Sequence, residues 1–411
     1  MIDLHLFRTN REETIQLLAK KDPHFPVQEL IDRECSVREL QILVEALRSE
    51  KNLLAKEKTI TADIREKAIE LGKKLKSKEL ELETAQKALS TLWLTCPNIP
   101  TRDVPEGNKE SNTPVRRWGK VPAFSFPVRN HLQLNEINKW FDLDVAAKMS
   151  GSQFVYYTTH GAKIIYALTH LMLKNNAKHG FNPVIPPYLV TDKALYNGGN
   201  LPKFEGDFYR MEQDNLCLIP TAEVSLTNVH AGDILDASQL PIRYTAWTSC
   251  FRREAGGYGA AERGIIRIHQ FEKVELYALT KPEESTEELE RMVQCAESIL
   301  QALELTYEVV LLAGQDCSFG SAKTYDLEVW LPGQNRFQEV SSASNCTDFQ
   351  ARRSQIRYRD EVGKKPTLVH TLNASSLALP RLMVALMEQG QQEDGTIRLP
   401  KALTEIMDVL W

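Results

Sequence analysis

The residues between Cys250 and Tyr277 carry the side-chain types that are needed to hold a phosphate, a flat base and an amino group together. The segment reads CFRREAGGYGAAERGIIRIHQFEKVELY and predicts two strands joined by a glycine-rich loop. Because side chains alternate along a strand, Arg252 and Glu254 should share one face of the first strand. On the second strand, one face should carry Arg267, His269, Phe271, Lys273 and Glu275, and the other Ile266, Ile268, Val274 and Leu276.

The spacing on the second strand suits a long, flat ligand that ends in a charged group. Phe271 and Glu275 lie four residues apart in the sequence. Along an extended strand this separation is roughly 13 Å, which is about the length of an aminoacyl adenylate. Phe271 would stack on adenine, Arg252 would hold the α-phosphate and Glu275 would meet the amino acid. The alternative is a surface hairpin whose charged side chains pair with one another.

Length, charge and cysteine usage limit the class of protein. A chain of 411 residues predicts two or three domains and a core of ample size. The net charge of −5 argues against a nucleic-acid binder, although a large acidic enzyme can present a local basic face. The seven cysteines include no C-x-x-C pair, so we expect neither a zinc site nor a disulfide framework. The odd number of cysteines fits a reducing compartment.

The N-terminal sequence and the hydropathy predict a cytoplasmic location. Asp3 and Arg8 stand where a signal peptide needs an apolar run. No window holds about eighteen apolar residues, so we expect no segment that spans a membrane.

Residues 27–96 predict a long helical hairpin. They contain no proline and one glycine, Gly72. Apolar residues recur in steps of three and four, which is typical of a heptad seam, with an interruption at Lys78 and a break near residues 57–63. Two helices of about 30 residues would each run roughly 45 Å, so we expect an antiparallel coiled-coil arm that projects from a body. The series comprises Leu30, Val37, Leu40, Val44, Leu47, Leu54, Ile64, Ala68, Leu71, Leu75, Leu82, Ala85, Leu89 and Leu92.

A linker and a globular body follow the arm. Three prolines fall within a short polar stretch at residues 97–105, which is typical of a linker. We therefore predict an N-terminal domain over residues 1–112 and a catalytic domain over residues 113–411.

The body predicts short strands mixed with helices, including a helix at residues 160–180 and a hairpin at residues 326–342. Strands joined by hairpins imply an antiparallel sheet, so the expected fold class is α+β. No P-loop and no complete G-x-G-x-x-G occurs, which disfavours a Rossmann-type nucleotide site.

The segment from Cys250 to Tyr277 resembles the second signature motif of the class II aminoacyl-tRNA synthetases. That motif reads Phe-Arg-x-Glu, and residues 251–254 match it. The continuation HQFEKVE at residues 269–275 is similar to the seryl-tRNA synthetase family in particular. Five further segments resemble the same family, and with the arm they cover nearly the whole chain. The resemblance implies a class II catalytic domain built on an antiparallel sheet.

The resemblance places a serine site in three of these segments. Residues 216–228 carry the family's Thr-Ala-Glu, so Thr221 and Glu223 are expected to contact the serine amino group. Glu275 and Ser375 match the positions that read the serine hydroxyl, and Arg252 would lie beside them. Taken alone, Thr221 is better explained as a helix N-cap and Glu223 as an acid that complements the helix dipole, and both roles can hold at once.

The resemblance also places an ATP site. Glu339 and Ser342 are expected to bind Mg²⁺ with ATP, because oxygen ligands suit magnesium. Glu328 is a weaker candidate ligand, and Glu339 taken alone is better explained as an edge-strand charge. Pro380 fits the first turn of a helix and places Arg381 near the ATP phosphates. The expected ATP-binding residues are Arg252, Glu254, Phe271, Glu339, Ser342 and Arg381.

Parts of two segments depart from the family, and a third suggests an interface. Ala374 and Ser376 replace common glycines and would strain the loop if either position needs a positive φ. Ala260 and Ala261 replace residues that are often charged, so contact with the tRNA acceptor end would be weaker. Pro187 matches the proline of the first motif, which builds a dimer interface in the family, so we expect a homodimer.

The resemblance implies a serine–tRNA ligase that acts in two steps. The serine carboxylate attacks the α-phosphate of ATP to give seryl-adenylate and pyrophosphate, and the tRNA(Ser) terminal ribose then takes the seryl group. tRNA(Sec) is left open as a second acceptor. Arg252, Glu254 and Arg381 are the expected catalytic residues, and they supply positioning and charge rather than covalent chemistry.

The arm is the expected tRNA-binding element. Residues 27–95 hold thirteen acidic and thirteen basic residues. Five basic residues concentrate on the second helix and are candidate phosphate contacts: Arg65, Lys67, Lys73, Lys74 and Lys76. The alternative for each is a solvated helix surface with ion pairs.

Three other readings of the whole chain remain. They are a relative that activates an amino acid for a carrier protein, a coiled-coil protein with a decayed catalytic body, and a class II synthetase for another amino acid.

Overall fold

The computed structural model describes residues 1–56, 61–254, 264–361 and 363–411. These residues form two compact units, Met1–Pro97 and Asn98–Trp411, and each is described by itself. The division predicted at residues 112 and 113 stays a prediction. In the part of the chain that the structure describes, no helix has the length and apolar character that crossing a membrane requires.

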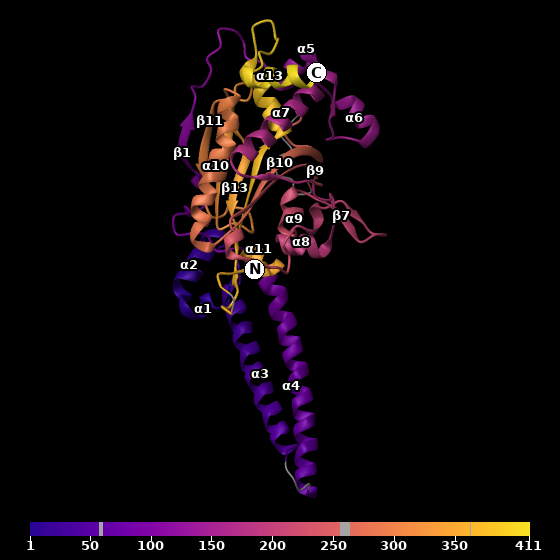
Figure 1. The fold of residues 1–411 in the computed structure, drawn as a ribbon, viewed down its shortest axis with the longest axis vertical. Helices are drawn as coiled ribbons and strands as arrows, with labels where there is room; N and C mark the ends of the chain where they lie inside the picture. Colours follow the sequence, from indigo (N-terminus) through magenta and orange to yellow (C-terminus); the bar gives the residue numbers. More distant parts are fainter. Residues whose placement is uncertain (57–60, 255–263, 362) are drawn as a thin grey trace. The chain divides into compact units, whose positions relative to one another are not determined.

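The first unit is a helical hairpin with two short helices at its base. Helices α1 (Leu6–Thr9) and α2 (Arg11–Lys21) precede the long helices α3 (Val27–Leu54) and α4 (Ala62–Leu94), which lie side by side (Figure 1). The predicted arm is confirmed. Helix α4 begins after Thr61, whose side chain caps the backbone N–H of Ile64. Residues 57–60 of the predicted break lie outside the described residues.

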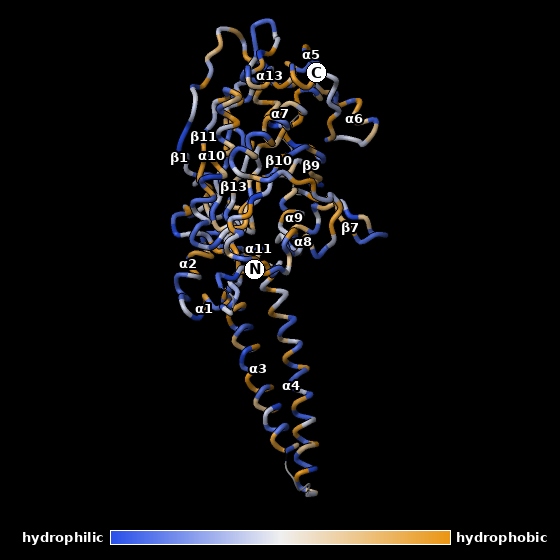
Figure 2. Tube along the Cα trace, in the orientation of Figure 1, coloured by the Kyte–Doolittle hydropathy of each residue, from blue (hydrophilic) through white to orange (hydrophobic). Residues whose placement is uncertain are grey.

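The predicted seam holds the two long helices together. Val44 and Leu47 of α3 cluster with Leu71 and Leu75 of α4, and all four are buried. Figure 2 shows hydrophobic residues recurring along both helices in alternation with hydrophilic ones. This alternation leaves one stripe of each helix for the partner helix and the rest for solvent, as a heptad pattern requires.

The second unit is built on an eight-stranded sheet. Its strand order is β1, β11, β12, β13, β16, β10, β9, β4, and every neighbouring pair is antiparallel except β4 with β9. The predicted α+β class with an antiparallel sheet is therefore confirmed. The strands are β1 (Thr113–Trp118), β4 (Asn182–Pro183), β9 (Ile242–Phe251), β10 (Gln270–Thr280), β11 (Tyr307–Leu311), β12 (Lys323–Leu331), β13 (Arg336–Asn345) and β16 (His370–Ala378).

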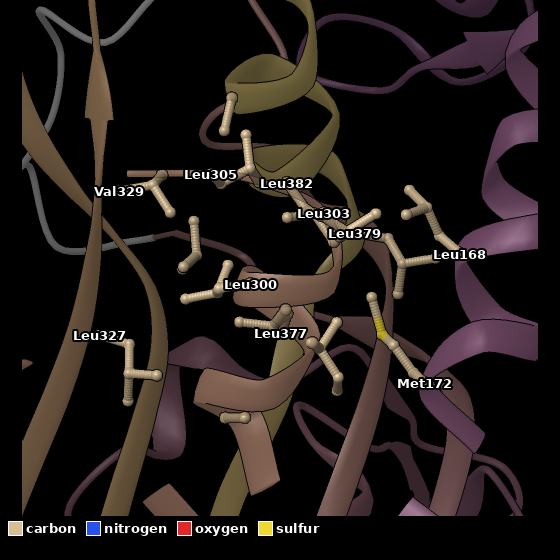
Figure 3. Packing of buried hydrophobic residues seen from close by; sticks show 14 of the residues in the cluster. Leu168, Met172, Leu300, Leu303, Leu305, Leu327, Val329, Leu377, Leu379 and Leu382 are labelled. Atoms are coloured by element: carbon tan, nitrogen blue, oxygen red, sulfur yellow. The ribbon is translucent and has the colours of Figure 1, made fainter. Parts of the chain in front are cut away.

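Three helices pack on one face of this sheet and form the main core. They are α7 (Thr159–Lys178), α10 (Ser285–Ala302) and α12 (Leu379–Gly390), and Figure 1 shows α7 and α10 lying against the strands. Figure 3 shows Leu168 and Met172 of α7 on one side of the cluster and Leu327 of β12 on the other, with Leu300 of α10 and Leu382 of α12 between them. Burying each such side chain contributes about 1.5–3 kcal/mol, so this cluster fixes how the helices lie on the sheet.

The remaining elements surround this core. The helices are α5 (His131–Asn138), α6 (Leu143–Ser150), α8 (Asp192–Gly198), α9 (Ala222–Thr227), α11 (Phe349–Ser354) and α13 (Lys401–Leu410). Three small sheets pair β2 (Phe141–Asp142) with β3 (Tyr156–Tyr157), β5 (Leu189–Thr191) and β6 (Arg210–Met211) with β7 (Leu216–Leu218), and β8 (Ile234–Asp236) and β15 (Thr367–Leu368) with β14 (Arg357–Arg359). Single 3₁₀ turns are η1 (Lys109–Ser111), η2 (Glu205–Asp207), η3 (Ala237–Gln239) and η4 (Pro282–Glu284).

The predicted hairpin at residues 250–277 is confirmed in its centre and wrong at its ends. β9 ends at Phe251, so Arg252 and Glu254 lie beyond the strand, and Glu254 has a left-handed φ of 53°. β10 begins at Gln270, so residues 266–269 precede it. Gly264 has a φ of 81°, which is a turn conformation and is incompatible with an extended strand at this residue. The predicted glycine-rich loop, with Ala260 and Ala261, lies outside the described residues.

Within β10 the predicted alternation is confirmed. Val274 and Leu276 belong to the main core, whereas Lys273 and Glu275 are buried on the opposite face. The strand therefore separates apolar packing from charged groups by the period of two that every strand imposes.

Candidate active site

A pocket gathers most of the residues expected to bind ATP. It lies between the ends of β9 and β10, the strand β13 and the start of α12. Its walls are formed by Arg252, Glu254, Ile266, Arg267, Ile268, Phe271, Lys273, Glu339, Val340, Ser375, Ala378, Pro380 and Arg381. Residues from four separate stretches of the chain thus meet around one space.

An arginine and an aromatic ring stack at one wall of this pocket. The guanidinium carbon of Arg252 lies 5.2 Å from the ring centroid of Phe271. The Arg252 Nε donates a hydrogen bond to the carbonyl of Pro220 over 3.2 Å. A guanidinium that stacks over a ring can still donate hydrogen bonds to an anion through its remaining N–H groups. Glu254 forms an ion pair with Arg267 over 2.5 Å. This pair sets the direction of the Glu254 side chain, because residue 254 lies beyond the end of β9 and strand alternation does not apply to it.

The opposite wall is an ion pair between α12 and β13. Arg381 Nη1 lies 3.1 Å from Glu339 Oε2 and 3.0 Å from the Glu339 carbonyl, and Arg381 Nε donates to the carbonyl of Ile266 at 3.3 Å. Burial opposes ionisation of Glu339, but the charge of Arg381 and its hydrogen bond lower the pKa of this carboxyl overall. Pro380 occupies the first turn of α12, as predicted, and sets Arg381 at its N-terminal end.

Behind the pocket lies a buried triad of Thr221, Lys273 and Glu275. Lys273 Nζ lies 2.5 Å from Glu275 Oε2 and donates to Thr221 Oγ1 at 2.7 Å. Thr221 Oγ1 in turn donates to Glu275 Oε2 at 3.2 Å. Burial raises the pKa of Glu275, and the charge of Lys273 opposes that rise. The sequence placed Lys273 on this face but gave it no role, although its alternation with Phe271 and Glu275 was the available signal.

Glu223 is held at the start of α9 beside the same triad. The predicted N-cap is confirmed, because Thr221 Oγ1 accepts from the Glu223 backbone N–H at 3.2 Å. Gln350 Nε2 and Asn373 Nδ2 donate to Glu223 Oε1 at 2.5 and 3.1 Å. Burial, and then the negative charge of Glu275, raise the pKa of Glu223 to about 7. No local sequence signal indicated these two amides, which are more than a hundred residues away in the chain.

The third expected segment approaches the triad through a bulge. Ser375 pairs with Glu275 across β16 and β10, and the register shifts before Ala378 pairs with Lys273. Leu377 takes the positive φ, at 86°, rather than Ala374 or Ser376. The expected strain at Ala374 and Ser376 is therefore absent, and both side chains are buried.

A second cavity of about 480 Å³ adjoins the pocket through Glu339. Asp326, Glu328 and Ser342 line it on β12 and β13, and Asp326 Oδ1 is buried without a hydrogen-bond partner. Burial and the neighbouring carboxylates raise the pKa of both Asp326 and Glu328. Among the residues that the structure describes, no three His, Cys, Asp or Glu side chains are placed to hold a metal ion by themselves.

The five basic candidates on the arm lie outside this site, in the other unit. Arg65, Lys67, Lys73, Lys74 and Lys76 are exposed on α4. Their position off the seam agrees with the prediction, and their contact with a nucleic acid stays a prediction.

Comparison with known proteins identifies the family. Residues 1–100 match the profile described as "Seryl-tRNA synthetase N-terminal domain", and residues 204–390 match "tRNA synthetase class II core domain (G, H, P, S and T)". The serine–tRNA ligase of Ureaplasma parvum is 45% identical over 413 residues, covering 98% of this chain and 99% of that protein. The chain belongs to the seryl-tRNA synthetase family.

Other relatives match the chain along nearly its whole length. The serine–tRNA ligase of Stutzerimonas stutzeri is 43% identical over 99% of the chain and 98% of its own length. The crystal structure of seryl-tRNA synthetase from Pyrococcus horikoshii complexed with ATP is 36% identical, with a TM-score of 0.94 over 99% of this chain and 98% of its own.

The predicted enzyme class, an ATP-dependent ligase, and the predicted reaction, serine–tRNA ligation, are confirmed by this membership. The alternative readings are set aside, because the matching relatives cover both arm and body and are named for serine.

With Glu223 as the predicted contact of the serine amino group, its raised pKa predicts how the use of serine depends on pH. A carboxyl must be ionised to hold an ammonium group, and a group with a pKa of about 7 loses its charge as the pH falls through 7. We expect kcat/KM for serine in pyrophosphate exchange to fall about tenfold from pH 8 to pH 6, since this ratio reports the free enzyme.

The control is Glu223→Gln, which should have a low kcat/KM at every pH and lack this step. A wild-type kcat/KM that stays flat between pH 6 and pH 8 would contradict the assignment of Glu223 as the titrating group.

Proposed function

We propose that the pocket between Arg252 and Arg381 forms seryl-adenylate, with ATP above the buried triad and serine within reach of it. The arrangement that carries this proposal is the meeting of a stacked arginine, an ion-paired arginine and the carboxylates of Glu254 and Glu339 around one space, with Lys273 of the buried triad in its wall. Adenine would stack on Phe271 near Arg252, and the phosphates would lie between the two arginines.

Charge neutralisation is the main task of the phosphate end. Arg252 and Arg381 would hold the phosphates, and both are already oriented by hydrogen bonds to backbone carbonyls. Donors that are fixed before the reaction need no reorganisation when charge develops in the transition state. Glu254, which is paired with Arg267, would meet the nucleotide from the same wall.

Magnesium fits the oxygen donors at Glu339 and Ser342. The carboxylate of Glu339 is kept ionised by Arg381, and the cavity beyond it is lined by oxygen-bearing side chains. Magnesium prefers oxygen ligands and retains several of its own waters, so two protein oxygens beside a triphosphate suffice. When bound, the ion would offset negative charge on the phosphates. The expectation that the enzyme needs no zinc stays a prediction.

Four residues would recognise the amino group and the hydroxyl of serine. Thr221 and Glu223 would contact the amino group, and Glu275 with Ser375 would contact the hydroxyl. A pocket built to hydrogen-bond a hydroxyl can reject the analogue without it by about 10⁴–10⁵, which would exclude alanine.

The arm would bind tRNA through its exposed basic residues on α4, and tRNA(Ser) is the expected partner. All five are exposed on helix α4, and none of them belongs to its seam. Contacts of this kind position a nucleic acid without reading its sequence. The acceptor set, including tRNA(Sec), and a cytoplasmic location remain predictions.

A homodimer is proposed from an apolar groove around Pro187. The groove has a volume of about 390 Å³ and includes Ile185, which is 90% exposed, with Leu189 and Val229. Exposed apolar residues that gather in one place indicate an interaction surface. A two-fold interface would bury the patch against its own copy.

The roles of Arg252 and Glu275 predict large losses of activity. Arg252→Ala and Glu275→Ala should each lower serine-dependent ATP–pyrophosphate exchange by at least about 10²-fold, the scale of a lost charged contact in the transition state. Arg253→Ala is the matched control, because Arg253 is exposed and does not line the pocket. Near-normal exchange in Arg252→Ala would contradict its role, and a higher kcat/KM with another amino acid would contradict serine specificity.

Shortening the arm should separate serine activation from tRNA charging. Residues 41–86 would be removed and the ends joined by a short Gly-Ser linker, which keeps the base of the hairpin and the Trp93–Ile2 hydrogen bond. Serine activation should stay largely intact, whereas tRNA charging should fall by several orders of magnitude, about 10³-fold or more.

The five basic residues are tested together by substitution with glutamine. The slope of log affinity for tRNA against log salt should become shallower, because fewer counterions are released. The double variant Lys78→Gln, Lys87→Gln is the control, since both lysines are paired with glutamates on the same helix. Normal charging by the shortened protein, or an unchanged slope in the five-site variant, would place the tRNA contacts elsewhere.

The groove around Pro187 predicts a dimer of about twice 46.7 kDa. Ile185→Asp should shift the protein toward a monomer by light scattering, because it would bury a charge without a partner. Val409→Asp, at a residue that is 82% exposed outside the groove, should leave the dimer intact. A wild-type monomer that is fully active at micromolar concentration would refute the proposal.

A further inference from the structure

A buried histidine and a buried glutamate lie together at the far end of α12. His131 is the first residue of α5 and is 4% exposed, and Glu388 of α12 is fully buried. The Glu388 Oε1 accepts from the His131 backbone N–H at 3.0 Å and lies 3.2 Å from His131 Nδ1. The other oxygen, Oε2, accepts from the Gly333 N–H at 2.8 Å. Glu388 therefore connects both the start of α5 and the turn between β12 and β13 to helix α12.

The second nitrogen of the His131 ring faces a glycine. His131 Nε2 is buried and has no hydrogen-bond partner. Because Nδ1 meets a carboxylate, the proton of a neutral ring belongs on Nδ1 and leaves Nε2 bare. A Cβ atom on Gly264 would overlap Nε2 and would lie 3.0 Å from Cδ2 and 3.1 Å from Cε1 of the same ring. The backbone at Gly264 thus rests directly against the imidazole edge.

Gly264 and Glu388 are each a short step from the ATP pocket. Gly264 precedes Ile266 by two residues, and the Ile266 carbonyl accepts from Arg381 Nε at 3.3 Å. Glu388 follows Arg381 by seven residues on α12, which is about two helical turns and the same side of the helix. His131 and the Arg381–Ile266 bond therefore connect the same two segments, and the position of one constrains the other.

We propose that His131 is a positioning residue for ATP. Its ring keeps Gly264 and α12 at a fixed distance from each other, and this distance directs Arg381 into the pocket. The proposal deepens the proposed function, because it rests on the assignment of Arg381 to the ATP phosphates. Glycine is required at residue 264 both for its φ of 81° and for the closeness of the ring. A small displacement of a positioning group can cost about 10²-fold in rate, so the effect should be measurable far from the chemistry.

The test compares variants of the full-length enzyme in pyrophosphate exchange. Gly264→Ala should lower kcat/KM for ATP by at least about tenfold while kcat/KM for serine, measured at saturating ATP, stays within about threefold. Gly363→Ala is the matched control, because Gly363 has a φ of 93° and nothing within 4 Å of the added Cβ. It imposes the same backbone conformation on alanine without a neighbour, so it should leave kcat/KM for ATP unchanged.

The double variant separates the contact from general destabilisation. His131→Ala should itself lower kcat/KM for ATP, and adding Gly264→Ala to it should cost no more than Gly363→Ala costs in the wild type, since the ring is gone. His131→Asn keeps a donor toward Glu388 and serves if His131→Ala does not fold. Thermal midpoints of all variants are measured alongside.

The proposal is overturned if the His131 variants keep the full kcat/KM for ATP, or if the effects of Gly264→Ala and His131→Ala on it are additive. Arg381→Ala provides the reference for the proposed function. If it leaves exchange intact, the role of Arg381 fails; if it abolishes exchange while the His131 variants are normal, only the role of His131 fails.

Discussion

The contact between Lys273 and Glu275 on β10 is the interaction on which the site depends. Both side chains are buried, and removing one partner of such a pair typically costs about 3–5 kcal/mol because a charge is left without compensation. The opposite face of the same strand supplies Val274 and Leu276 to the main core. A slip of one residue in pairing would move both charges into that core, so core packing and site chemistry enforce the same register.

The pocket in front of this pair is assembled from groups that already have partners. Arg381 is bound to Glu339 and to a backbone carbonyl, and Arg252 is bound to another carbonyl while it lies over an aromatic ring. These contacts set the direction of each guanidinium before any anion arrives. Binding an anion then costs less ordering of flexible side chains, which is the physical advantage of a preorganised site.

The two units differ in how their folds arise. The helices of the arm meet through residues that a repeating pattern marks, and helix contacts of this kind follow from periodicity alone. The body instead joins strands whose order in the sheet departs from their order in the sequence, with β10 between β16 and β9. Contacts between segments so distant in the sequence depend on the whole fold, and this explains why the strand ends at residues 252–254 and 266–269 were predicted wrongly.

The sequence by itself determined the arm, the antiparallel sheet, the alternation along β10 and the N-cap at Thr221, because each follows from local spacing or side-chain type. Only the tertiary structure decided which groups complete the site. Gln350 and Asn373 reach Glu223 from remote segments, Leu377 takes the positive φ in place of its neighbours, and His131 meets Gly264. No periodic pattern in the sequence marks these contacts, since burial and backbone bending bring the residues together only after the core has formed.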